Sequence, residues 1–131
     1  LGTNDLGFVP SDAYRVNMEW IVQTSIDNGV IPVLSTIPER EDVPGRATEF
    51  NNIIRDIANR YQVPLWDYHA ILATLPNNGL GPDGVHPSGS PNGWVGNADF
   101  KASNLQYGFP VRNLTALAVL HSLWQQVIMR A

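Results

Sequence analysis

The chain has 131 residues and a formal net charge of −4, and its 44% hydrophobic residues suit a folded domain rather than wholesale disorder. Its single Lys and seven Arg are scattered, which argues against a nucleic-acid-binding surface or a polybasic membrane patch. The absence of Cys excludes a disulfide scaffold, a thiol nucleophile and a Cys-ligated zinc ion, and no apolar stretch is long enough to span a membrane.

The first part of the chain predicts a loop, a helix and a short strand. A loop over residues 1–10 precedes a helix over 11–28, for which Ser11 is the expected N-cap and Gly29 the glycine that follows the last turn. The apolar run 30–35 predicts a strand that is covered on both faces, as in a parallel sheet.

A second helix and strand follow a polar loop. Apolar residues spaced alternately three and one apart from Phe50 to Tyr61 predict an amphipathic helix over 46–61. The run 63–66 predicts another short buried strand, and a short helix is expected over 68–75.

The segment 76–110 differs from the rest, because it holds 12 of the 21 Gly and Pro residues. Loops of this length are usually functional. A long helix is expected over 112–130. Strands that alternate with helices indicate an α/β fold with a parallel sheet, in which sites form at the carboxyl ends of the strands.

Asp83-Gly84-Val85-His86 is the strongest local signal for chemistry. In a tight turn the Asp83 carboxylate can accept the Nδ1–H of His86, which fixes the tautomer and leaves Nε2 free to act as a general base. The alternative is a common Asp-Gly turn with a solvated His86.

Leu1-Gly2-Thr3-Asn4-Asp5 is the second signal. If Leu1 ends a strand, Gly2 allows a sharp exit, and the Asn4 amide can donate a hydrogen bond to a developing oxyanion. The alternative is an Asx-turn or a helix cap made by Asn4 and Asp5.

Together, and in this order, the two signals resemble blocks of the SGNH (GDSL-type) hydrolase family. Gly2, Asn4 and Asp5 match a Gly-x-Asn-Asp block at a strand end, and Asp83 and His86 match an Asp-x-x-His block. The helices and strands between the blocks, and the closing helix, are also similar to that family.

The resemblance implies a three-layer α/β/α sandwich with a parallel, flavodoxin-like sheet, here an incomplete single domain over residues 1–131. It implies that Asp83 and His86 are the acidic and basic members of a Ser-His-Asp triad, and that Gly2 and Asn4 belong to the oxyanion and substrate site. The expected substrates are small acyl or carbohydrate O-acyl esters, with no cofactor and no metal ion.

The family's Gly-Asp-Ser block is not found among the 131 residues, and no Ser follows a Gly-Asp pair. We therefore expect a fragment or processed product, whose nucleophile lies in a missing N-terminal segment, and no catalysis by this chain alone. Ser88 is close to His86 but lacks the setting of a nucleophile. The alternatives are a non-catalytic binding or assembly protein that uses the aromatic residues of segment 87–110, and an acyltransferase.

The remaining residues carry weaker expectations. His69 and His121 are read as capping, packing or surface residues, and the acidic and basic residues 39–42 as a solvated loop in which Arg40 could touch a substrate. The compartment is not determined, although low Lys content, absent Cys and abundant Asn, Gly and Pro favour secretion or the cell envelope.

Overall fold

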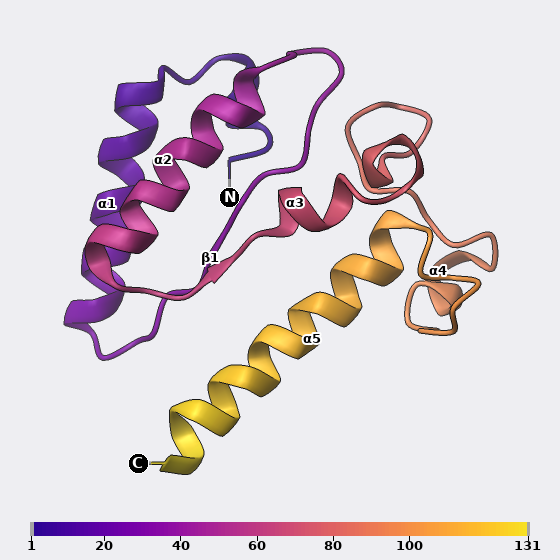
Figure 1. The fold of residues 1–131 in the computed structure, drawn as a ribbon. Helices are drawn as coiled ribbons and strands as arrows, with labels where there is room; N and C mark the ends of the chain where they lie inside the picture. The colour runs from indigo at the N-terminus through magenta and orange to yellow at the C-terminus, as the bar shows by residue number, and fades with distance from the viewer. Residues whose placement is uncertain (1, 131) are drawn as a thin grey trace. The chain divides into compact units, whose positions relative to one another are not determined.

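The computed structural model describes residues 2–130, and the chain forms two compact units, Leu1–His69 and Ala70–Ala131. The first unit contains η1 (Asp5–Gly7), α1 (Ser11–Asp27), β1 (Leu34–Ser35), α2 (Arg46–Tyr61) and β2 (Leu65–Trp66) (Figure 1). Helix α3 (Tyr68–Leu72) leads into the second unit, which continues with η2 (Pro76–Gly79), α4 (Gly93–Gly96), α5 (Gly108–Gln126) and η3 (Ile128–Arg130). The order of α1, β1, α2, β2, α3 and α5 agrees with the sequence prediction, whereas η1, η2 and α4 lie in segments predicted as loops. The strand end expected at Leu1 lies outside the described residues.

Helices α1 and α2 lie side by side and form the core of the first unit (Figure 1). The Tyr14 and Phe50 rings pack with centroids 4.1 Å apart. The apolar face expected on α2 is buried except for Tyr61, which is partly buried, and α1 adds Tyr14, Met18 and Val22 to the core. The core comprises Leu6, Tyr14, Met18, Val22, Leu34, Ile37, Ala47, Phe50, Ile53, Ile54, Ile57 and Ala58. Burial of these side chains is the main stabilisation that this unit has.

The two ends of α1 differ in how well the sequence predicts them. Ser11 is the first helical residue rather than the N-cap, because Pro10 takes the extended cap conformation and its carbonyl accepts the Tyr14 amide at 2.9 Å. The expectation for Gly29 is confirmed, since it has φ +72° and its N–H donates to the Ile26 carbonyl at 2.9 Å.

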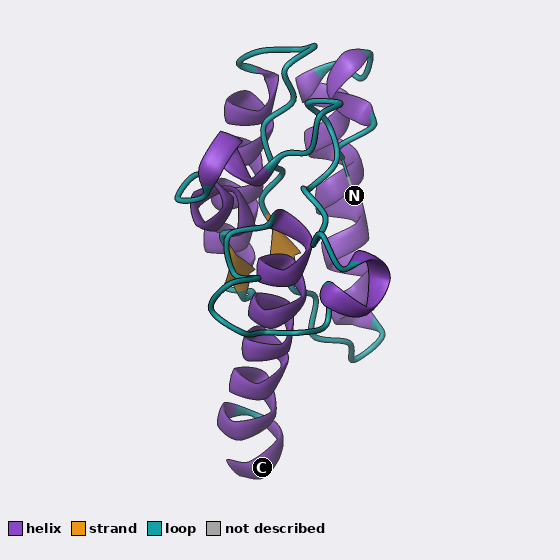
Figure 2. Cartoon of the chain, turned by 90° about the vertical axis from the view of Figure 1, so that its right-hand side faces the viewer, coloured by secondary structure: helices purple, strands orange, loops and turns teal. Residues whose placement is uncertain are grey.

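Strands β1 and β2 pair in parallel, as predicted, with Leu34 opposite Leu65 and Ser35 opposite Trp66 (Figure 2). Both are shorter than expected. The Leu34 amide donates to the Pro64 carbonyl at 2.9 Å, and the next donor along the ladder would be Pro32, which has no N–H.

The expected burial of both strand faces is wrong for the described residues. Leu34 is 5% exposed and faces the helices, whereas Leu65 and Val33 are each 37% exposed. Within the first unit, the helices therefore cover the face of the sheet that carries Leu34.

In the second unit, α5 begins four residues before the predicted start and ends at Gln126, after which Ile128–Arg130 form a 3-10 turn. Its apolar residues from Leu117 onward remain largely exposed, with Leu120 at 64% and Trp124 at 46%. Among residues 2–130, no helix combines the length and apolar character needed to cross a bilayer.

The segment predicted as a loop over 76–110 is ordered by a buried polar network. The Ser90 amide donates to the Asn97 side chain at 2.9 Å, and the Ser90 hydroxyl donates to the Asn104 side chain at 3.1 Å. The Asn104 side chain donates in turn to the Asp99 carbonyl at 3.1 Å. These bonds satisfy backbone groups that a loop without regular structure would otherwise leave unpaired.

Candidate active site

A tight turn in the first unit presents Asn4. The Gly2 carbonyl accepts the Asp5 amide at 2.9 Å and the Leu6 amide at 3.2 Å. Gly2 has φ +104°, and a Cβ atom there would lie 2.6 Å from Ile37 Cδ1 and 2.8 Å from Tyr14 Oη. Backbone conformation and close packing both require glycine at this position.

The Asn4 side chain is exposed and does not cap η1. The Asx-turn and cap alternatives are therefore not observed for Asn4. Within residues 2–130 no hydrogen bond is formed by the side-chain amide of Asn4, so both hydrogens of its NH2 group are available to a ligand. An amide in this state can donate to an oxyanion without first breaking an internal bond.

In the second unit, residues 83–86 form the carboxylate–imidazole pair that the sequence predicts as one of two alternatives. His86 Nδ1 lies 2.8 Å from Asp83 Oδ2. Asp83 Oδ1 accepts the backbone amides of Val85 and His86, each at 3.0 Å. Gly84 at the tip of the turn has φ +65°, which a side-chain-bearing residue rarely adopts.

These hydrogen bonds set the charge of Asp83. The backbone amide of His86, its imidazole ring and the Val85 amide together lower the pKa of Asp83 to about 2. The carboxylate is therefore ionised at neutral pH and only accepts, so His86 Nδ1 carries the hydrogen. Nε2 of the neutral ring is then the basic nitrogen, and the His86 side chain is 73% exposed.

Ser88 has a structural role at the base of this turn. Its backbone amide donates to the Gly79 carbonyl at 2.7 Å, and its hydroxyl accepts the Gly108 amide at 2.8 Å. The Gly81 amide donates to the His86 carbonyl at 2.8 Å. In residues 70–130, no serine hydroxyl forms a hydrogen bond with His86.

A second carboxylate–imidazole pair follows the two strands, and the sequence analysis missed it. His69 Nε2 lies 2.9 Å from Glu39 Oε1, and the Thr36 hydroxyl accepts the His69 amide at 2.8 Å. The available signal was that Thr36 and Glu39 follow β1, while His69 follows β2, because the carboxyl ends of parallel strands share one edge of a sheet. His69 is therefore not the simple cap or surface residue that was expected.

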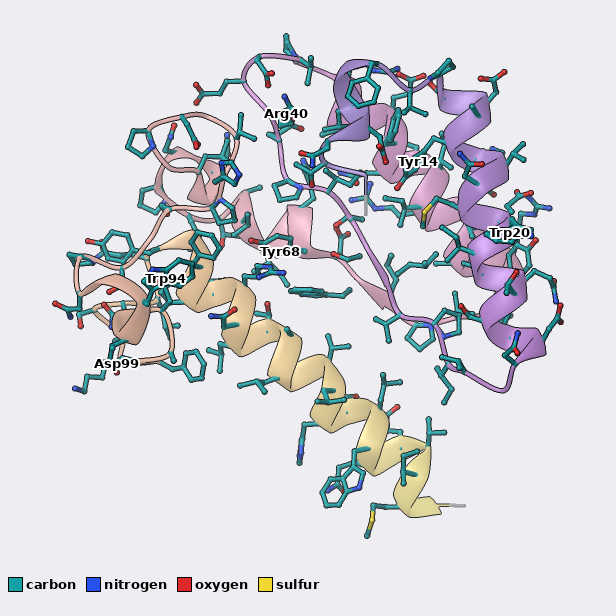
Figure 3. The ribbon with its side chains drawn as sticks, turned by 180° about the vertical axis from the view of Figure 1, so that it is seen from behind. Tyr14, Trp20, Arg40, Tyr68, Trp94 and Asp99 are labelled. Carbon is teal, nitrogen blue, oxygen red and sulfur yellow. The ribbon has the colours of Figure 1, made fainter. Side chains whose placement is uncertain are left out.

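The structure also places Arg40 and the aromatic residues of segment 87–110. Arg40 is paired with Asp42 and with the Thr3 carbonyl rather than solvated, and Figure 3 shows it on the segment that follows β1. Trp94 is 87% exposed on α4, whereas the Phe100, Tyr107 and Phe109 side chains are partly buried. These aromatic residues of segment 87–110 therefore differ in exposure, and Trp94 is the most exposed of the four.

Gly2 and Asn4 belong to the first unit and Asp83 and His86 to the second, so the structure defines each pair within its own unit. A parallel strand pair, a free amide donor and an imidazole oriented by a carboxylate are features of α/β hydrolases that use a general base. The family model of the GDSL-like lipases and acylhydrolases matches residues 1–90, a range that includes all four residues. The chain belongs to the GDSL-like Lipase/Acylhydrolase family, and the resemblance drawn from the motifs is confirmed. Comparison with curated proteins and with solved structures finds no significant match.

Proposed function

We propose that this chain supplies the acid–base pair and one oxyanion donor of a serine ester hydrolase, whose nucleophilic serine lies outside these 131 residues. The observation that carries the proposal is the 2.8 Å contact between His86 Nδ1 and Asp83 Oδ2. The contact orients the ring and favours the protonated imidazole that forms during acyl transfer. Membership of the acylhydrolase family supports the same reaction class.

The proposed reaction has two halves. His86 Nε2 removes the proton of the serine hydroxyl as its oxygen attacks the ester carbonyl, and then gives that proton to the leaving alcohol. Water hydrolyses the acyl-serine in the second half, with His86 again acting as the base. The Asn4 amide donates to the oxyanion in both tetrahedral intermediates. The substrates we propose are small acyl esters or O-acyl esters of carbohydrates.

Substitutions in the complete protein test this assignment with p-nitrophenyl acetate as substrate. His86→Ala should nearly abolish turnover, and Asp83→Asn should lower kcat by up to about 10⁴-fold. His121→Ala is the matched control, because His121 is an exposed histidine on α5. Near-normal turnover in His86→Ala would contradict the proposal.

Covalent labelling locates the nucleophile. A fluorophosphonate should label one serine of the complete protein and none in the isolated 131-residue chain. A labelled serine within residues 1–131 would contradict the external nucleophile. A complete protein without labelling or turnover would favour a binding or assembly role, and transfer to an added alcohol in preference to water would favour an acyltransferase.

A further inference from the structure

The turn that carries Asn4 is tied to the rest of the first unit by two arginines. Arg46 donates to the Leu6 carbonyl at 3.0 Å and to the Val9 carbonyl at 2.7 Å, which holds the chain after the turn. Arg40 NH1 donates to the Thr3 carbonyl at 2.8 Å, immediately before Asn4. Arg46 therefore holds the chain after Asn4, the proposed oxyanion donor, whereas Arg40 holds the peptide group directly before it.

The Arg40 guanidinium is itself held in place. Its Nε lies 2.9 Å from Asp42 Oδ1 and its NH2 lies 2.5 Å from Asp42 Oδ2, which is a bidentate pair. The Arg40 side chain is 15% exposed. Because the guanidinium is planar, two bonds to one carboxylate fix the plane in which the third donor points at Thr3.

Holding the Thr3 carbonyl controls the direction of Asn4. The carbonyl of Thr3 and the N–H of Asn4 belong to one planar peptide group, so a bond to the carbonyl fixes the plane from which the Asn4 side chain departs. Gly2 fixes the inner side of the same turn through its carbonyl, which accepts the Asp5 and Leu6 amides. Arg40 is the charged side chain that acts from outside the turn.

We infer that Arg40, clamped by Asp42, is a positioning residue that holds the Asn4 amide in the orientation needed for oxyanion stabilisation. The inference rests on the proposed function, in which Asn4 is the donor. Arg40 acts through Asn4 and does not itself bind the substrate. Its loss should therefore lower kcat and leave KM nearly unchanged.

A double-mutant cycle in the complete protein tests this role with p-nitrophenyl acetate. Asn4→Ala should lower kcat by about 10²–10³-fold. Arg40→Gln should lower it by about 10-fold to 100-fold, the usual cost of a small misplacement. In the Asn4→Ala background, Arg40→Gln should cost less than about twofold, because the residue through which it acts is gone.

The conservative variant and the matched control sharpen the test. Arg40→Lys keeps the charge, but an ammonium group lacks the planar set of donors that binds Asp42 and the Thr3 carbonyl at the same time. We therefore expect Arg40→Lys to behave like Arg40→Gln. Arg15→Gln removes an arginine that pairs with Glu19 and Asp56 and should leave kcat unchanged. Full activity in Arg40→Lys would show that charge alone matters and would overturn the inference.

The outcomes separate the two proposals. An unchanged kcat in Asn4→Ala would contradict the oxyanion role that belongs to the proposed function. A large loss in Asn4→Ala with no loss in Arg40→Gln, or with fully multiplicative losses, would overturn the positioning role alone. A raised KM in Arg40→Gln at constant kcat would mean that Arg40 contacts the substrate directly, which also overturns it.

Hydrogen exchange in the complete protein gives a readout that needs no turnover. Arg40→Gln should accelerate exchange of the Asp5 and Leu6 amides, which donate to Gly2 within the turn. Arg15→Gln should leave both rates unchanged. Equal protection of these amides in Arg40→Gln and in the unmodified chain would overturn the inference.

Discussion

Gly108 approaches Gly79 so closely that a Cβ atom on Gly108 would lie 2.1 Å from the Gly79 carbonyl oxygen. The same Cβ would lie 3.0 Å from the Ser88 amide nitrogen. The Gly79 carbonyl already accepts that amide at 2.7 Å. The first residue of α5 is therefore packed against the base of the turn that holds Asp83 and His86.

We predict that Gly108→Ala lowers the free energy of unfolding by about 1–3 kcal/mol, because the atoms in the way belong to the backbone and cannot rotate aside. Gly89→Ala is the control, since a Cβ at Gly89 would meet no atom within 4 Å. Thermal denaturation followed by circular dichroism compares the two variants. Equal melting temperatures for both would contradict the close approach.

Gly2→Ala should disorder the turn that presents Asn4. The φ of +104° strains a residue that bears a side chain, at a cost of about 1–3 kcal/mol, and contact with Ile37 and Tyr14 adds to this cost. Gly7→Ala is the control in the same segment, because a Cβ atom on Gly7 would have no atom within 4 Å. Urea denaturation should show a lower midpoint for Gly2→Ala only; a shared shift would refute the prediction.

Asn51 on α2 forms two hydrogen bonds with the backbone of the segment that follows β1. It is fully buried, accepts the Ile37 amide at 2.6 Å and donates to the Ile37 carbonyl at 2.8 Å. Asn51→Leu leaves both backbone groups buried without partners, so we expect a loss of about 2–4 kcal/mol in the free energy of unfolding. Asn52→Leu, at the exposed neighbouring position, should change stability by less than about 0.5 kcal/mol in the same denaturation experiment. A similarly small effect of Asn51→Leu would be the contrary result.

The fold could be predicted best where one physical signal dominates. The predicted helix over 46–61 coincides with α2, because its apolar face has a regular helical period and is buried from Phe50 to Ala58, with Tyr61 partly buried at its end. Strand lengths were overestimated, because hydrophobicity indicated strands while Pro32 and Pro64 remove donors from the ladder. The expectation of one domain over residues 1–131 stays a prediction.

The site could be predicted where its residues are local in sequence. Asp83 and His86 are three residues apart, so a single turn brings their side chains into contact. The Gly between them indicates such a turn in the sequence. The Glu39–His69 contact spans 30 residues and depends on the parallel pairing of β1 and β2. Neither residue has a motif of its own, so local sequence could not distinguish the pair from solvated surface residues.

The ionisation of Asp83 gives a pH-dependent prediction. Its pKa is lowered from 3.8 to about 2, chiefly by the His86 backbone amide and then by the imidazole ring. A folded-state pKa below the ordinary value means that this carboxylate stabilises the folded turn above about pH 4, and that the contribution is lost as pH falls through about 2. Carbon-13 NMR of the Asp83 carboxyl group should give a midpoint near 2. In His86→Ala the midpoint should rise towards 3.8 without reaching it, because the backbone amides at positions 85 and 86 still donate. A midpoint of 3.8 in the unmodified chain would mean that the turn does not hold the carboxylate against the imidazole.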